Sequence, residues 1–197
     1  MESDGELLLR LRSGDERAFV SLVQRYQEQM LQLAAGFVPS RAVAEEVVQD
    51  TWLAVLRGLD AFEGRSSLKT WLFSILVNRA RTTGVREHRS VPVADPEPAV
   101  DPARFDASGG WADPPEHWVE AVESRLEAGK LAGRIRALMD ELPDRQREVV
   151  LLRDVEELTS DEVCSVLSIS DGNQRVLLHR GRSRLRQLFE DEIREVR

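Results

Sequence analysis

The chain has 197 residues with 27 basic and 35 acidic side chains, which gives a formal net charge of −8. This length fits one large domain or two small ones, and the single cysteine, Cys164, excludes an internal disulfide and a zinc site built from several thiolates. No apolar run approaches the roughly 18 residues that a membrane-spanning helix needs, and the acidic start of the chain is unlike a secretion signal, so we expect a cytoplasmic protein.

Residues 1–89 predict a small helical bundle, because apolar residues recur three and four positions apart in three segments. The first stripe runs from Phe19 to Leu33, and the second runs from Val48 to Leu59 after a break at Pro39. The third helix should begin near Leu68, after a loop that supplies a serine cap. Its apolar side comprises Trp71, Leu72, Ile75 and Leu76. Its other side is basic and amide-bearing, with Lys69, Asn78, Arg79 and Arg81.

Residues 90–127 predict an extended acidic linker rather than a folded unit. The segment carries 2 basic and 9 acidic side chains and is rich in proline. Such a composition buries too little apolar area to offset the entropy of ordering the chain. Trp111 and Trp118 are unusual in a linker, and they either dock on a neighbouring domain or anchor the linker on a partner.

Residues 128–197 also predict helices, and among them a helix-turn-helix. An apolar stripe from Leu131 to Met139, which includes Ile135, ends before Pro143, and Asp144 can cap the next helix. Ser160 can cap a short helix that ends at the turn 168–170, and Ser170 or Asp171 can cap the last helix. The whole pattern indicates an all-α fold of two small helical domains joined by the extended acidic, proline-rich linker.

Positive charge is concentrated in two short segments of this acidic chain. Residues 65–89 carry a net charge of +5 and residues 171–189 a net charge of +4. Basic residues on the second helix of a helix-turn-helix are typical of a contact with the DNA groove, although a solvated amphipathic helix has the same pattern. The surrounding acidic surface would limit unspecific phosphate binding.

The sequence offers no pattern that favours an enzyme. His88, His117 and His179 fall in separate segments, and we find no phosphate-binding loop, no nucleophile elbow and no metal-ligand spacing. We therefore expect no catalytic residues, no metal, no cofactor and no small-molecule substrate.

Two pairs of segments resemble the extracytoplasmic-function (ECF) group of bacterial sigma factors in the sigma-70 family. Ala44–Phe62 and Ser66–Arg81 are similar to that family's region 2, and Glu141–Ser170 with Leu177–Arg186 is similar to its region 4. The resemblance implies region 2 at residues 1–89, a linker at 90–127 and region 4 at 128–197. It also implies a factor that binds core RNA polymerase, directs promoter-specific initiation and assists promoter opening. An anti-sigma factor is a further expected partner, and membrane insertion is not expected.

The resemblance also assigns roles to individual residues. The residues expected to bind core polymerase are Glu45, Glu46, Gln49 and Asp50. Those expected at the −10 element are Arg65, Ser66, Ser67, Lys69, Trp71, Asn78, Arg79 and Arg81. At the −35 element, Asn173, Gln174 and Arg175 are expected near base edges, and His179, Arg180, Arg182 and Arg184 near phosphates. Trp71 could stack on DNA from the edge of the third helix's apolar stripe, but its place on that stripe favours the core.

The last helix departs from the family pattern. Ser168 stands in the turn where glycine is usual, Gln174 stands where a core valine is common, and Val176 and Leu177 stand where exposed residues are common. Two other functions stay open from the sequence: a stand-alone helix-turn-helix transcriptional regulator, and a decoy that occupies polymerase without directing initiation.

Overall fold

The computed structural model describes residues 4–87, 134–135 and 137–195. These residues form helices and the loops between them, without a strand, and confirm the predicted all-α class. The predicted linker 90–127, with Trp111 and Trp118, lies outside the described residues.

The N-terminal half contains four α-helices and a short 3-10 turn. They are α1 (Asp4–Arg12), α2 (Glu16–Ala35), α3 (Arg41–Gly58), η1 (Leu59–Ala61) and α4 (Leu68–Glu87). Short polar side chains fix where the helices begin: the carboxylate of Asp15 accepts from two backbone N–H groups of α2, and the Ser40 hydroxyl accepts from the N–H of Val43. The Ser67 hydroxyl accepts from the N–H of Thr70 at 3.1 Å, which confirms a serine cap on α4.

The core of this half follows the predicted stripes on α2 and α3. Leu22 and Met30 of α2 and Val48 and Val55 of α3 are all buried. Trp52 packs edge-on against Phe19 and donates its indole N–H to Gln27 at 2.7 Å, as a core tryptophan with a satisfied polar atom should.

Helix α4 is buried over a wider arc than the predicted stripe. Leu72 and Leu76 are in the core as expected, but Phe73, Val77 and Ala80 are fully buried as well. A helix that is apolar on more than one side must be covered from more than one direction. The second cover is the C-terminal half, described next.

The C-terminal half comprises a helical segment at 134–135 and 137–140, α7 (Asp144–Val150), one π-helical turn η3 (Leu151–Val155), α8 (Ser160–Leu167) and α9 (Asp171–Glu195). Three local expectations need correction. Asp144 begins α7 but pairs with Arg147 at 2.7 Å and makes no cap hydrogen bond. Thr159, one residue before Ser160, caps α8 and forms a reciprocal capping box with Glu162. Ile135 is 42% exposed, although it belongs to the predicted apolar stripe.

The predicted helix-turn-helix is present in α8 and α9. Ser168 ends α8 in the left-handed conformation with φ 54°, a place that suits glycine better because a Cβ is strained there. The Ser170 hydroxyl accepts from the N–H of Asn173 at 3.3 Å and so caps α9. Serine residues therefore stand on both sides of this turn, Ser168 through its backbone conformation and Ser170 through its hydroxyl.

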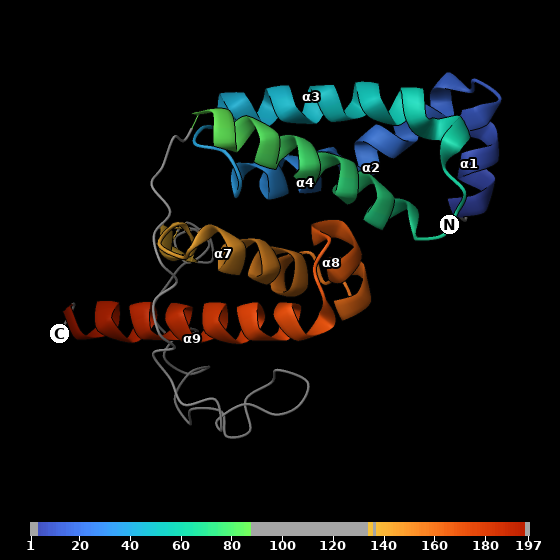
Figure 1. Cartoon of the computed structure of the whole chain (residues 1–197). Helices are drawn as coiled ribbons and strands as arrows, with labels where there is room; N and C mark the ends of the chain where they lie inside the picture. The colour runs from blue at the N-terminus through green and yellow to red at the C-terminus, as the bar shows by residue number, and fades with distance from the viewer. Residues whose placement is uncertain (1–3, 88–133, 136, 196–197) are drawn as a thin grey trace.

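The two halves pack together through α4. Figure 1 shows α4 on the side of the N-terminal bundle that faces α7 and α8, and α4 contacts α8 directly. Buried side chains of both halves, from Leu72 of α4 to Leu152 and Val163 of the C-terminal half, belong to one continuous apolar cluster. The halves therefore share a core in this conformation.

The close packing of α7 on α9 depends on Gly181. A Cβ at this position would lie 2.7 Å from Cγ2 of Val150 and 3.3 Å from the backbone oxygen of Gln146. We expect Gly181→Ala to lower the free energy of unfolding by about 1–3 kcal/mol, because this overpacking outweighs the better helix propensity of alanine. Urea unfolding followed by circular dichroism measures it.

Gly172 supplies the matched control on the same helix, because a Cβ there meets nothing within 4 Å. Gly172→Ala should leave the stability unchanged or raise it by up to about 1 kcal/mol. A Gly181→Ala variant as stable as Gly172→Ala would contradict the close packing of α7 on α9.

Candidate functional site

An acidic face on α3 is open to solvent. Glu45, Glu46, Gln49 and Asp50 are all exposed there, and their spacing places them along one side of the helix. Leu53 and Leu56 continue this side of α3 and are 51% and 50% exposed. These two leucines were not among the residues expected from the sequence, although Leu53 lies four and Leu56 seven residues after Gln49, on the same side of α3. Together the six residues form a mixed acidic and apolar surface, which suits a partner that is itself basic and apolar.

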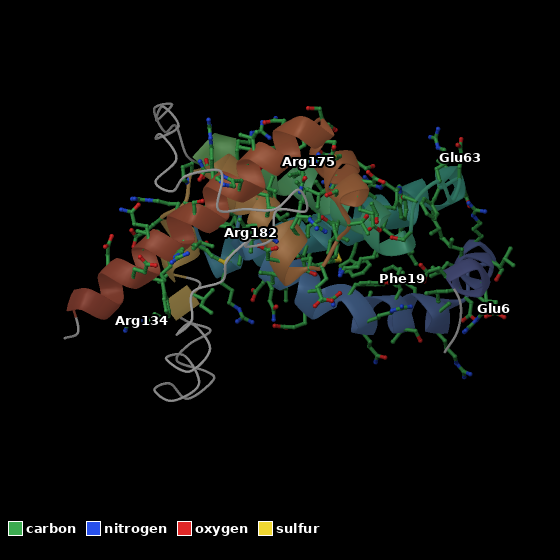
Figure 2. The ribbon with its side chains drawn as sticks, turned by 90° about the horizontal axis from the view of Figure 1, so that it is seen from below. Glu6, Phe19, Glu63, Arg134, Arg175 and Arg182 are labelled. Atoms are coloured by element: carbon green, nitrogen blue, oxygen red, sulfur yellow. The ribbon has the colours of Figure 1, made fainter. Side chains whose placement is uncertain are left out.

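The loop before α4 is also exposed. Gly64 adopts a left-handed conformation with φ 70°, and Arg65 lies 3.1 Å from Glu63 with both side chains largely in solvent. Figure 2 shows Glu63 in this loop, well separated from Arg134 at the other end of the molecule. An ion pair this exposed contributes little, so Arg65 remains able to exchange Glu63 for another anion.

Three residues of α4 that were expected at DNA differ in their surroundings. Trp71 is half-buried and packs on Phe62 with ring centroids 4.7 Å apart, which favours the core alternative for this residue. Asn78 is exposed in the second half of α4. Arg79 lies 3.6 Å from Asp50, and so it links α4 to the acidic face of α3.

Lys69 and Arg81 are not on an open basic face, contrary to expectation. Lys69 Nζ donates to the backbone oxygen of Glu156 at 2.7 Å and lies 3.4 Å from its carboxylate. Arg81 Nε donates to Glu148 at 2.9 Å, and a second guanidinium nitrogen donates to the other carboxylate oxygen of Glu148. Both cations therefore face the C-terminal half, because α7, η3 and α8 cover this side of α4.

The start of α4 makes a third contact across the same boundary. Thr70 Oγ1 donates to Glu162 at 2.6 Å, and the Ser67 hydroxyl donates to the same oxygen at 3.2 Å. The hydrogen bond from Thr70, supported by those from Thr159 and Ser67, lowers the pKa of Glu162. Burial raises the pKa of Glu156, and the charge of Lys69 opposes that rise.

The first turns of α9 present two polar side chains outward. Asn173 and Arg175 are exposed, and Arg175 pairs with Asp171 at 2.7 Å on the same helix. Figure 2 shows Arg175 near the end of α9 that adjoins the turn. Both side chains carry the hydrogen-bonding groups that read base edges in a major groove.

Gln174 does not belong to this outward set, which corrects the expectation for it. Its side chain is fully buried, and the Ser160 hydroxyl of α8 lies 3.5 Å from its Oε1. The helical register explains this, since Gln174 lies three and four residues before the buried Leu177 and Leu178 and so shares their side of α9. Leu177 is buried for the same reason, whereas Val176 is 48% exposed.

The later basic residues of α9 are less exposed than Arg175. Arg182 donates twice to Asp154, at 3.0 and 2.7 Å, and so it holds α9 to η3. Burial, aided by the charge of Arg180, lowers the pKa of His179 and so favours its neutral form. Arg180 and Arg184 are half-buried. Asn173 and Arg175 are thus the better placed of the residues expected at the −35 element.

Two negative findings apply to the part of the chain that the structure describes. No group of three or more histidine, cysteine or acidic side chains there could hold a metal ion. No helix there is both long enough and apolar enough to cross a membrane.

Comparisons with known proteins match two separate parts of the chain. A family model described as "Sigma-70 region 2" matches residues 22–90, and one described as "Sigma-70, region 4" matches residues 132–185. An "ECF RNA polymerase sigma-E factor" of Salmonella typhimurium is 29% identical over 98% of this chain and 97% of its own length. The "RNA polymerase sigma-H factor" of Pseudomonas aeruginosa is 28% identical over 99% of this chain and 98% of its own length.

Two solved structures have a similar fold. CnrH, in complex with the cytosolic domain of CnrY, matches with a TM-score of 0.66 and 23% identity, and the match covers 96% of this chain and 99% of CnrH. The sigma factor RpoE of Bartonella quintana, in complex with the anti-sigma factor NepR, matches with a TM-score of 0.58 and 21% identity over 87% of this chain and 96% of its own.

Proposed function

The chain belongs to the sigma-70 family, since models of two regions of that family together match more than half of it, and we propose how it performs that family's task. The protein is a sigma factor of the ECF type that binds core RNA polymerase and directs promoter-specific initiation. The observation that carries the proposal is the presence, in one chain, of an exposed acidic and apolar face on α3 and a helix-turn-helix that presents Asn173 and Arg175.

We assign the docking of core polymerase to the α3 face. Its carboxylates would pair with a basic partner surface, and Leu53 and Leu56 would lose water on contact. The acidic residues alone would contribute only weak, salt-sensitive binding energy. The leucines are therefore an important addition to the set of docking residues expected from the sequence.

We assign the −10 element to the loop before α4 and to the outer side of α4. Asn78 can hydrogen-bond a base edge, and Arg65 and Arg79 can neutralise phosphates. The hydroxyls of Ser66 and Ser67 and the backbone of the loop could hold a base turned out of the stack. We assign the −35 element to α9, where Arg175 can hydrogen-bond a guanine edge and Asn173 an adenine edge.

Membership of this family also suggests which partners the protein has, whether it is an enzyme and where in the cell it works. The family is not a class of enzymes, so we infer that the protein carries out no bond chemistry of its own. It would work in the cytoplasm, where polymerase and promoter DNA are. Because the solved RpoE structure includes an anti-sigma factor, we extend that kind of partner to this chain as part of the proposal.

The assignment of separate tasks to α3 and α4 is tested by two variants measured in parallel. Asn78→Ala should bind core polymerase within about twofold of the parent, yet open a promoter about tenfold less well, because one base-edge contact is worth about 1–3 kcal/mol. The double variant Gln49→Ala, Asp50→Ala should bind core polymerase more weakly than the parent. It should open the promoter normally once saturating protein restores the complex.

Core binding is measured by fluorescence anisotropy, and opening by permanganate reactivity of unpaired thymines. Equal loss of both properties in Asn78→Ala would contradict its role at the −10 element. Normal core binding by the double variant would contradict the docking face. DNA binding by the protein alone, without any core binding, would favour the stand-alone regulator, and core binding without initiation would favour the decoy.

A further inference from the structure

The loop that precedes α4, residues 62–67, is held weakly by the pairs between its exposed side chains. Glu63 and Arg65 lie 3.1 Å apart, but they are 67% and 87% exposed. The Ser66 hydroxyl donates to the neighbouring backbone oxygen of Ser67 at 3.4 Å. Contacts this exposed contribute little to conformation. A loop that is to hold one base in a fixed place therefore needs supports from outside.

Helix α1 supplies such a support at the start of the loop. The guanidinium of Arg12, the last residue of α1, donates to the backbone oxygen of Phe62 through Nη2, and both Nε and Nη2 donate to the backbone oxygen of Leu59 at 3.4 Å. The ring of Phe62 is already fixed by its burial and by its contact with Trp71. Arg12 adds a hold on the carbonyl group, and so it fixes the direction in which the chain leaves Phe62.

The other end of α1 supports the end of the loop. Asp4, the first residue of α1, accepts at 3.4 Å from the backbone N–H of Leu68, which is the first residue of α4. The N–H groups in the first turn of a helix have no partner within the helix, and a carboxylate is favourable there because of the helix dipole. Arg25 of α2 lies 3.6 Å from the other carboxylate oxygen of Asp4 and so steadies it.

The body of α1 brings both of these groups to the loop. Leu7 and Leu11 are buried and seat α1 on the bundle. Asp4 precedes Leu7 by three residues and Arg12 directly follows Leu11, so the two polar groups flank the apolar side of α1. Figure 1 shows the connection from α3 to α4 running alongside α1. A helix of nine residues is about 13 Å long, so its two ends reach two separate points of the loop.

We propose that α1 is a positioning element for promoter recognition: Arg12 and Asp4 hold the two ends of the loop 62–67 in one geometry and thereby set its base preference. The base preference rests on the proposed assignment of the −10 element to this loop; the hold of α1 on the loop does not. Both residues act through the loop and touch no base themselves. Without the hold the loop would sample several shapes, and a loop that samples several shapes discriminates less between bases.

The proposal is tested in the full chain by removing both supports. The double variant Asp4→Ala, Arg12→Met loses the carboxylate and the guanidinium but keeps the apolar length of the arginine. Arg10→Met is the matched control, because Arg10 lies on the same helix and donates to Asp15 at the start of α2 at 2.8 Å. The conservative pair Asp4→Asn, Arg12→Lys keeps an oxygen acceptor and an N–H donor. Urea unfolding establishes that all three variants are folded.

Two readouts separate the hold on the loop from its effect on promoters. The mobility of a nitroxide at Arg65→Cys, in a Cys164→Ser background, reports the freedom of the loop in the protein without polymerase. Base preference is read, with unlabelled variants, from transcription by the assembled polymerase on a promoter pool with a randomised −10 element and a fixed −35 element. A second pool with a randomised −35 element reports general damage to the protein.

We expect the double variant to show a more mobile label than the parent, and its preference for the best base over the next at one or more −10 positions to fall about fivefold or more. Its −35 preference and its core affinity should stay within about twofold of the parent's, because those contacts lie on other elements. The control should match the parent in both readouts, and the conservative pair should regain most of the lost preference.

A label no more mobile than in the parent would overturn the hold and leave the proposed function standing. A more mobile loop with an unchanged −10 preference would overturn the positioning role and count against the −10 assignment to this loop. Equal losses of −10 and −35 preference would mean a general structural defect, which would also overturn the positioning role. A parent protein that gives no specific starts would contradict the proposed function, and the base preference with it.

Discussion

Replacing Arg175 with alanine is expected to weaken the binding of promoter DNA by the polymerase-bound protein about 5- to 150-fold. Arg175 is 65% exposed in the first turns of α9, and its partner Asp171 is itself half in solvent, so the guanidinium can leave that pair for a guanine edge. The loss corresponds to one bidentate contact with a base, worth about 1–3 kcal/mol. It is measured as the affinity of the assembled complex for a −35 fragment, and the loss should disappear on fragments whose contacted base pair is changed.

Arg182 supplies the matched control on the same helix. Its guanidinium is held by two hydrogen bonds to Asp154 of η3, and it is only 23% exposed. Arg182→Ala should therefore lower the free energy of unfolding by about 1 kcal/mol while changing promoter affinity less than threefold. Equal losses of affinity in the two variants would mean that α9 contacts DNA only through its charge, and would contradict base reading by Arg175.

Replacing Phe73 with alanine is expected to lower the free energy of unfolding by about 3–5 kcal/mol, the largest effect on stability that we expect from a single change. Phe73 is the largest fully buried side chain on α4, and Lys69 lies 5.2 Å above its ring. The truncation loses apolar burial, leaves a cavity and removes the surface on which Lys69 rests. Urea unfolding monitored by circular dichroism gives the value.

Val20→Ala is the control for this stability measurement, because Val20 is a 52% exposed apolar residue on α2 of the same bundle. We expect its free energy of unfolding to change by less than about 0.5 kcal/mol. If Phe73→Ala were no less stable than Val20→Ala, the burial of α4 on two sides would be contradicted.

The contrast between α3 and α4 shows which parts of the fold could be predicted from sequence. On α3, one apolar stripe faces one core, so Val48 and Val55 were placed correctly by their spacing. On α4, periodicity identified the side that packs on α2 and α3 but not the burial of Phe73 or the pairing of Lys69 and Arg81. Those features depend on a second half that is more than sixty residues away along the chain.

The helix-turn-helix shows a second limit of prediction from sequence: the exact residue that plays a given structural role could not be identified. Thr159 and Ser160 offer equivalent hydroxyls, and the reciprocal bond to Glu162 selects Thr159 as the cap. Gln174 was expected at DNA because of its side-chain chemistry, but the register of α9 turns it toward α8. A glutamine where an apolar residue is common was the signal in the sequence that this position is internal.

The acidic face of α3 was correctly found as a group of exposed residues, yet its apolar part was missed. Leu53 and Leu56 lie on the side of α3 that carries Gln49 and Asp50, outside the core stripe of Val48 and Val55, and both leucines are about half exposed. Exposed leucines beside carboxylates strengthen the proposal of a protein partner on this face, because apolar contact adds affinity that charge alone does not give.

The central claim, that the protein directs initiation, is tested most directly by run-off transcription with purified core polymerase on a pool of promoter fragments. We predict specific start sites only when core polymerase and this protein are both present, with two short elements enriched upstream of the starts. The Arg175→Ala variant should alter the enriched −35 element and leave the −10 element unchanged. An absence of specific starts, with core binding intact, would contradict the claim.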